Sequence, residues 1–182
     1  MKQIIFSAIV LLTATAVNAQ DYLTRSGNVS FFSHTSVEDI KALNTEAVST
    51  INSTTGDIEF RIAIKSFHFA KAAMEEHFND ENYMNSEKFP KASFKGKISN
   101  ISSVNFAKNG TYNVTVDGSL TIKDVTKTVS VPGTITIKDG KVTALATFKV
   151  KRKEYNVMGQ SFAQSKISDD IEITVNCEYT KR

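Results

Sequence analysis

Residues 112–150, "YNVTVDGSLTIKDVTKTVSVPGTITIKDGKVTALATFKV", decide the fold because apolar side chains recur there at every second position. The spacing extends over three successive runs, which start at Tyr112, Val125 and Val142 and are interrupted in the second run by Lys127. Strict alternation predicts β-strands that bury one face and expose the other to water. Three such runs in succession predict an antiparallel sheet.

The same pattern extends over most of the chain on both sides of this segment. It is found at 28–33, 47–52, 57–64 ("DIEFRIAI"), 92–98 and 171–179. Asn109-Gly110 and Asp139-Gly140 are dipeptides that favour tight hairpins, and 53–56 is a further polar turn. About eight consecutive strands predict an all-β fold, an antiparallel up-and-down barrel of eight strands that leaves no exposed edge.

One stretch departs from the strand pattern. In "FAKAAMEEHFND", residues 69–80, the positions of Phe69, Ala73, Met74 and Phe78 follow the three-and-four spacing of one helix face. The sequence therefore predicts one short helix inserted between strands.

The first 19 residues have the pattern of a signal peptide. Lys2 gives a positive start, 4–17 are mostly apolar, and Ala19 ends a small-residue cleavage site. Cleavage before Gln20 would leave a single domain, 20–182, in the periplasm or outside the cell. A glutamine rather than a cysteine at the cut predicts no membrane anchor.

Composition excludes several classes of function. A formal net charge of +3, with no basic block, argues against a nucleic-acid partner. The single cysteine, Cys177, cannot form an internal disulfide, and no Gly-x-Ser-x-Gly nucleophile motif is present. We expect no catalytic residue and no cofactor.

A metal site is the sharpest alternative. His68 and His77, with Glu76 or Asp80, would be the residues of a metal-dependent hydrolase. A catalytic zinc usually has three protein ligands, and the common helical motif places two histidines four residues apart. Nothing pairs with His77 in this way, so we expect no metal and interpret the carboxylates as a solvated helix face.

Small residues on the apolar strand faces allow two interpretations. They are Ala92, Gly96, Gly118, Ala144 and Ala146. Inside a closed eight-stranded barrel they would leave room for one small ligand. They would equally fit larger neighbours in a solid core, which would make the protein a ligand-free stress or interaction barrel.

Three blocks of the sequence resemble the YceI-like family of exported bacterial proteins. The first, "MEEHFNDENYMNSEKFPKASFKGKI" at 74–98, is similar to a helix ending in His-Phe followed by a Lys-x-Pro-x-x-x-Phe strand entry, here His77, Phe78, Lys88, Pro90 and Phe94. The second, "YNVTVDGSLTIKDVTKTVSVP" at 112–132, is similar to a Gly-x-Leu-Thr strand with a Val-Thr-Lys turn. The third, "KRKEYNVMG" at 151–159, is similar to a late Arg-x-x-Tyr segment at Arg152 and Tyr155.

The resemblance implies a lipocalin-like barrel that encloses a long apolar ligand in the periplasm, commonly a polyisoprenoid such as a quinone or an isoprenoid lipid carrier. It implies no catalytic residue, and it makes the helix with His77 a cap or rim. The expected partner is therefore an apolar or amphiphilic lipid. The cavity lining that we predict is Phe60, Ile62, Phe69, Met74, Phe78, Phe94, Tyr112, Val114 and Phe148.

Overall fold

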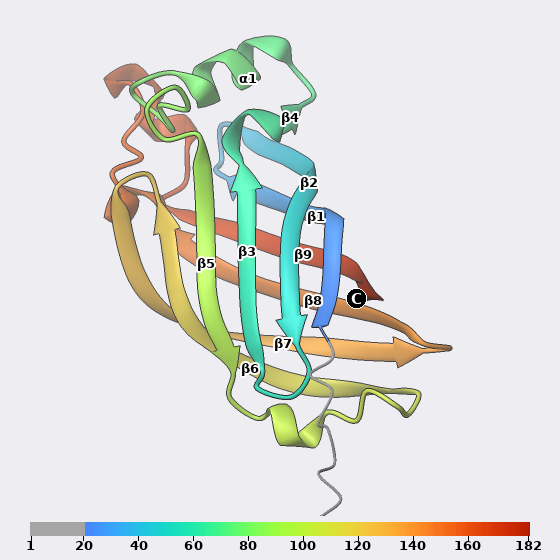
Figure 1. Cartoon of the computed structure of the whole chain (residues 1–182). Coiled ribbons are helices and arrows are strands. Elements are labelled where there is room, and N and C mark those ends of the chain that lie inside the picture. The colour runs from blue at the N-terminus through green and yellow to red at the C-terminus, as the bar shows by residue number, and fades with distance from the viewer. Residues whose placement is uncertain (1–20) are drawn as a thin grey trace, which may run out of the picture.

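The wall of the molecule is an antiparallel barrel of eight strands, with one further short strand added at β2 (Figure 1). The computed structural model describes residues 21–182, so the predicted signal peptide and its cleavage site lie outside the described residues. The strands are β1 (Asp21–His34), β2 (Asp39–Asn52), β3 (Asp57–Ala63), β4 (His68–Phe69), β5 (Lys91–Ile98), β6 (Gly110–Ile122), β7 (Val125–Lys138), β8 (Lys141–Lys151) and β9 (Asp170–Lys181).

The barrel closes because β1 pairs with the strands on both of its sides. Val29 lies opposite Asn44 of β2 and opposite Val175 of β9. The other strands follow in the order β9-β8-β7-β6-β5-β3-β2, and every pairing is antiparallel. The predicted fold class is confirmed, and the alternating sequence supplies its reason: each strand turns one apolar row inward.

Of the two predicted Asn-Gly or Asp-Gly hairpins, one is confirmed and one is wrong. Asp139 and Gly140 have φ of 51° and 80° and join β7 to β8. Gly110 instead opens β6, and Asn109 binds the other turn, because its Oδ1 accepts the N–H of Asp139 (3.0 Å) and its Nδ2 donates to Asp139 Oδ1 (3.1 Å). The connector from β5 to β6 contains a 3₁₀ turn, Ile101–Ser103.

The inserted helix is present but shorter than predicted. α1 spans Ala72–Asn79, whereas the spacing predicted 69–80. Phe69 is excluded from the helix because it pairs with Ala42 as part of β4, which requires extended backbone. Its N–H is bound by the Glu75 carboxylate (3.2 Å), so the first turn of α1 is tied to β4.

One end of the barrel, called the closed end below, is filled by side chains. Its cluster comprises Tyr22, Ile51, Ile58, Ile98, Val104, Val114, Ile135, Ile137, Val142, Cys177 and Tyr179. The hydroxyls of Ser49 and Tyr179 are hydrogen-bonded inside it (2.8 Å), and the Tyr22 and Phe106 rings stack below it with centroids 5.1 Å apart. Five residues of this cluster form the floor of the cavity described below: Ile51, Ile58, Ile98, Val114 and Ile135.

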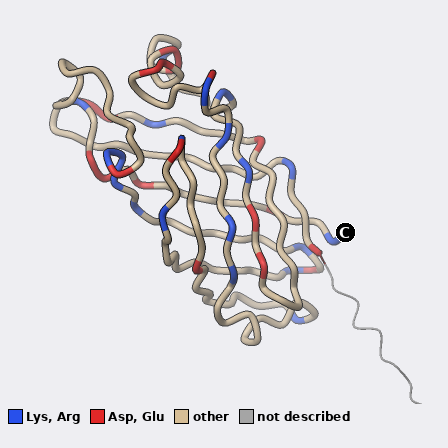
Figure 2. The backbone as a smooth tube through the Cα atoms, turned by 60° about the vertical axis from the view of Figure 1, so that its left-hand side comes forward, with Lys and Arg blue, Asp and Glu red and all other residues tan. Residues whose placement is uncertain are grey.

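The opposite end, called the mouth, carries the helix and two of the 3₁₀ turns (Figure 1). They are α1, the 3₁₀ turn η3 (Arg152–Tyr155) and the 3₁₀ turn η4 (Ser161–Lys166). Outside the barrel, basic and acidic side chains are interspersed along the strands (Figure 2), as in the ion pairs of Lys95 with Glu59 and Lys141 with Glu178. No helix within residues 21–182 has the length and apolar character to span a membrane.

Candidate functional site

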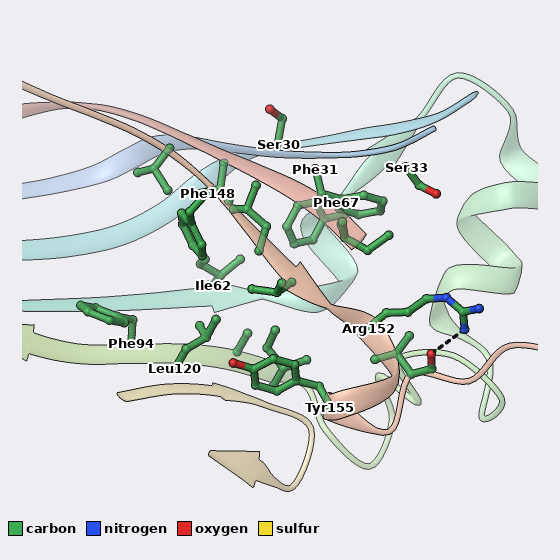
Figure 3. Close-up of a pocket in the computed structure, with 18 of the residues that line it drawn as sticks. Ser30, Phe31, Ser33, Ile62, Phe67, Phe94, Leu120, Phe148, Arg152 and Tyr155 are labelled. Carbon is green, nitrogen blue, oxygen red and sulfur yellow. Dashed lines mark hydrogen bonds between the residues drawn. The ribbon is translucent and has the colours of Figure 1, made fainter. Parts of the chain in front are cut away.

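The interior of the barrel between the closed end and the mouth is a cavity of about 480 Å³ (Figure 3). All eight barrel strands, α1 and η3 contribute to its lining. The lining is overwhelmingly aliphatic and aromatic, because it consists of the inward rows of the alternating strands. A volume of this size lies within the range of small-ligand sites, about 300–1,000 Å³.

The structure places eight of the nine predicted lining residues around this cavity: Phe60, Ile62, Phe69, Met74, Phe78, Phe94, Val114 and Phe148. Tyr112, the ninth, is not part of the lining. It lies near the start of β6, where its ring packs against the closed-end cluster and its hydroxyl donates to the backbone carbonyl of Lys108 (3.1 Å). Alternation gives the inward face correctly but not the depth at which the cavity ends.

Some of the small inward residues border open space, as expected for a ligand cavity, and others are covered by a larger neighbour, as expected for a solid core. Ala144 and Ala146 line the cavity and leave part of its volume free. Gly96 and Gly118, paired across β5 and β6, do not, because the Phe94 ring occupies the space next to both: a Cβ at either position would lie 2.5–2.6 Å from Phe94 Cζ.

Beneath α1, four phenylalanines form an aromatic cluster at the mouth. Phe31 and Phe78 contact each other, and each also contacts Phe67 and Phe69, with ring centroids 5.2–5.7 Å apart. The cluster joins β1, β4 and the helix, so α1 covers the cavity as a cap. Phe31 was predictable from the alternation of 28–33, whereas Phe67 follows a 3₁₀ turn and has no periodic signal.

Arg152 organises the segment that covers the other side of the mouth. The guanidinium is 5% exposed and donates from Nε to Ser168 O (3.0 Å), from Nη1 to Val157 O (2.9 Å) and from Nη2 to Gln164 Oε1 (2.8 Å). These bonds fold residues 152–168 over the barrel. The sequence resemblance pointed to Arg152 without assigning it this role.

The barrel wall is incomplete on one side. β7 and β8 pair from their hairpin only as far as Gly133 and Ala146, although β7 stays paired with β6 up to Val125 and β8 with β9 up to Lys151. Pro132 has no N–H to offer to β8, so the ladder ends beside it. Between 125–132 and 147–151 the strands separate, and we call this gap the seam.

The seam contains a small outer pocket of about 200 Å³, lined by 127–129, 149–151, Glu154 and Tyr155. The Lys127 ammonium spans it to reach the Glu154 carboxylate (3.0 Å). Tyr155 lines both this pocket and the central cavity. Its ring, 2% exposed, therefore forms the partition between them.

The histidines of the hydrolase alternative are not brought together with carboxylates as a metal centre. His68 Nδ1 lies 3.5 Å from the Glu75 carboxylate, and both His68 and His77 are exposed at the mouth. Within residues 21–182 no group of three or more His, Cys, Asp or Glu side chains is placed to hold a metal ion. The geometry gives this alternative no support.

A closed antiparallel barrel with an apolar cavity inside and a helix at its mouth has the architecture of small-ligand-binding barrels. Within that class, the YceI-like domain model matches residues 16–179, and the chain belongs to this family. No curated protein matches the sequence.

Solved structures share the fold at low sequence identity. BcnA of Burkholderia cenocepacia superposes with a TM-score of 0.71 at 19% identity, covering 85% of this chain and 96% of BcnA. A polyisoprenoid binding domain from Saccharophagus degradans, implicated in plant cell wall breakdown, gives 0.76 at 11% identity and 90% and 99% coverage. The Campylobacter jejuni YCEI protein gives 0.59 at 19% identity and 80% and 86% coverage.

Proposed function

We propose that the protein is an exported carrier or sequestering protein that holds an amphiphilic, isoprenoid-like lipid in the barrel cavity. The main observation behind the proposal is the cavity of about 480 Å³, which is lined by apolar side chains and covered by the aromatic cluster beneath α1. Burying a hydrocarbon tail there is favourable by about 25 cal/mol for each Å² removed from water. The description of the Saccharophagus degradans domain as polyisoprenoid-binding supports the same class of ligand.

The lipid would lie with its tail towards the closed end, because that part of the lining is predominantly aliphatic and aromatic. Its polar end would lie nearer the mouth, where Glu38, His77, Arg152 and Lys166 belong to the lining. No residue in this arrangement is assigned a catalytic role. The proposal includes export, which rests on the signal-peptide pattern of the first 19 residues.

The test is native mass spectrometry of the protein purified from its own host, followed by organic extraction. We expect a mass excess equal to one lipid per chain and recovery of that lipid in the extract. N-terminal sequencing of protein from outside the cytoplasm should begin at Gln20. Purified protein that carries no lipid and, once unfolded and refolded, takes up no isoprenoid probe would overturn the carrier function.

A further inference from the structure

The hydroxyl of Tyr155 lies inside the barrel without a hydrogen-bond partner. The side chain comes from η3, packs with Leu120 and Val150, and is 2% exposed. Figure 3 shows the hydroxyl directed into the cavity towards Leu120. Among residues 21–182 no atom is hydrogen-bonded to this hydroxyl, which borders the open space of the cavity rather than being sealed in the core.

Two other tyrosine hydroxyls of this protein are hydrogen-bonded to protein groups. The Tyr179 hydroxyl binds Ser49 at 2.8 Å, and the Tyr112 hydroxyl binds the Lys108 carbonyl at 3.1 Å. A hydroxyl that faces a cavity and lacks such a protein partner can form its hydrogen bond only with a molecule in the cavity, either water or a ligand. The Tyr155 hydroxyl faces open cavity instead, so a molecule in the cavity can supply the missing partner.

The buried cation nearest this position is already fully used. Arg152 donates to three backbone carbonyls, Ser168 O through Nε and Val157 O and Met158 O through Nη1, and to Gln164 through Nη2, beside which the Asp169 carboxylate lies 3.6 Å away. A phosphate or carboxylate drawn into the cavity would find no free N–H on it. Lys166 also borders the cavity, but its side chain is exposed at the mouth.

Tyr155 itself stays protonated at neutral pH. Burial raises the pKa of its hydroxyl above the ordinary value, and the nearby Glu154 carboxylate raises it further. The hydroxyl is therefore a neutral donor in surroundings that do not stabilise an anion.

We propose that Tyr155 donates a hydrogen bond to an uncharged oxygen of the bound lipid, so that the cavity selects amphiphiles with a carbonyl-type polar group over those with a phosphate or carboxylate. This inference rests on the proposed lipid-binding function and narrows its ligand class. It makes Tyr155 a specificity-determining residue at a fixed point of the wall, where η3 meets the seam.

The test compares three probes of one chain length: a long-chain methyl ketone, the corresponding alkane and the corresponding alkyl phosphate. Each competes with a fluorescent isoprenoid probe for wild type, Tyr155→Phe and the control Tyr112→Phe. We expect Tyr155→Phe to bind the ketone about three- to tenfold more weakly and the alkane unchanged, the effect of one lost hydrogen bond. Tyr112→Phe should bind all probes as wild type does, and the alkyl phosphate should be the weakest ligand throughout.

An infrared spectrum of the bound ketone gives a readout that packing alone would not move. The carbonyl band should lie at lower frequency in wild type than in Tyr155→Phe, because hydrogen bonding weakens the C=O bond. Equal losses for ketone and alkane, an unshifted band, or an alkyl phosphate that binds as well as the ketone would overturn the inference while the carrier function stands. Wild type that binds no probe would instead overturn the carrier function itself.

Discussion

The ring of Phe94 packs so closely on Gly118 that a Cβ at position 118 would lie 2.5 Å from ring carbon Cζ. Gly96, opposite Gly118 in the sheet, is in the same contact with a distance of 2.6 Å. The Phe94 ring therefore packs directly on the backbone of the two glycines, where no side chain displaces it. A small residue on an inward face therefore marks free space only where no neighbouring side chain fills it.

Gly118→Ala should destabilise the protein by about 1–3 kcal/mol, the usual cost of overpacking a filled interior. Denaturant unfolding measures the change. Adding Phe94→Leu should restore only part of the loss, because the Lys95 carbonyl also lies 2.5 Å from the Cβ position. A Gly118→Ala variant as stable as wild type would show that the Phe94 ring does not pack against Gly118.

Replacing Arg152 with Met should loosen the segment that covers the mouth. Four acceptors would lose the donor that binds them: Ser168 O, Val157 O, Met158 O and Gln164 Oε1. We expect a loss of about 3 kcal/mol in stability and faster amide exchange across 157–168. Arg152→Lys keeps the charge but not the forked geometry, so its stability and its amide exchange rates should lie between those of wild type and Arg152→Met. Unchanged exchange in the Met variant would contradict this role.

Cys177 is completely buried, and burial raises the pKa of its thiol to about 11 from 9.0. The folded protein at pH 8 should thus be inert to thiol reagents and should react at once when unfolded. The folded state holds the proton more tightly, so this contribution to stability is intact below pH 9 and is lost as pH rises through 11. Rapid labelling of the native thiol would be the opposite result.

The seam should be visible in hydrogen exchange. Residues 125–132 of β7 pair only with β6, whereas 133–138 pair with β8 as well. About half of the amides in 125–132 should exchange much faster than those in 133–138, since alternate N–H groups of a strand point to opposite sides. Uniform protection along β7 would mean that the strands close in solution.

The sequence was sufficient for the barrel and for the inward faces, because a two-residue period fixes which side chains point inward. Depth was not predictable: Tyr112 and Val114 share a face, yet only Val114 reaches the cavity. Phe67, Arg152 and Tyr155 follow or lie within 3₁₀ turns, where neither period applies. Their positions depend on tertiary contacts such as the bond of Arg152 to Ser168, which sequence spacing does not encode.

The substitution Ala146→Phe is the most direct test of the carrier proposal. Ala146 lines the cavity opposite Gly133 in the sheet, so a phenyl ring there would enter free volume rather than filled core. Delipidated Ala146→Phe should unfold within about 1 kcal/mol of wild type and bind a fluorescent isoprenoid probe at least tenfold more weakly. Ala47→Phe is the matched control, because Ala47 is 0% exposed, does not line the cavity and packs closely against Gly27. It should cost about 3 kcal/mol in stability. Equal destabilisation of both variants would show that the barrel interior is solid.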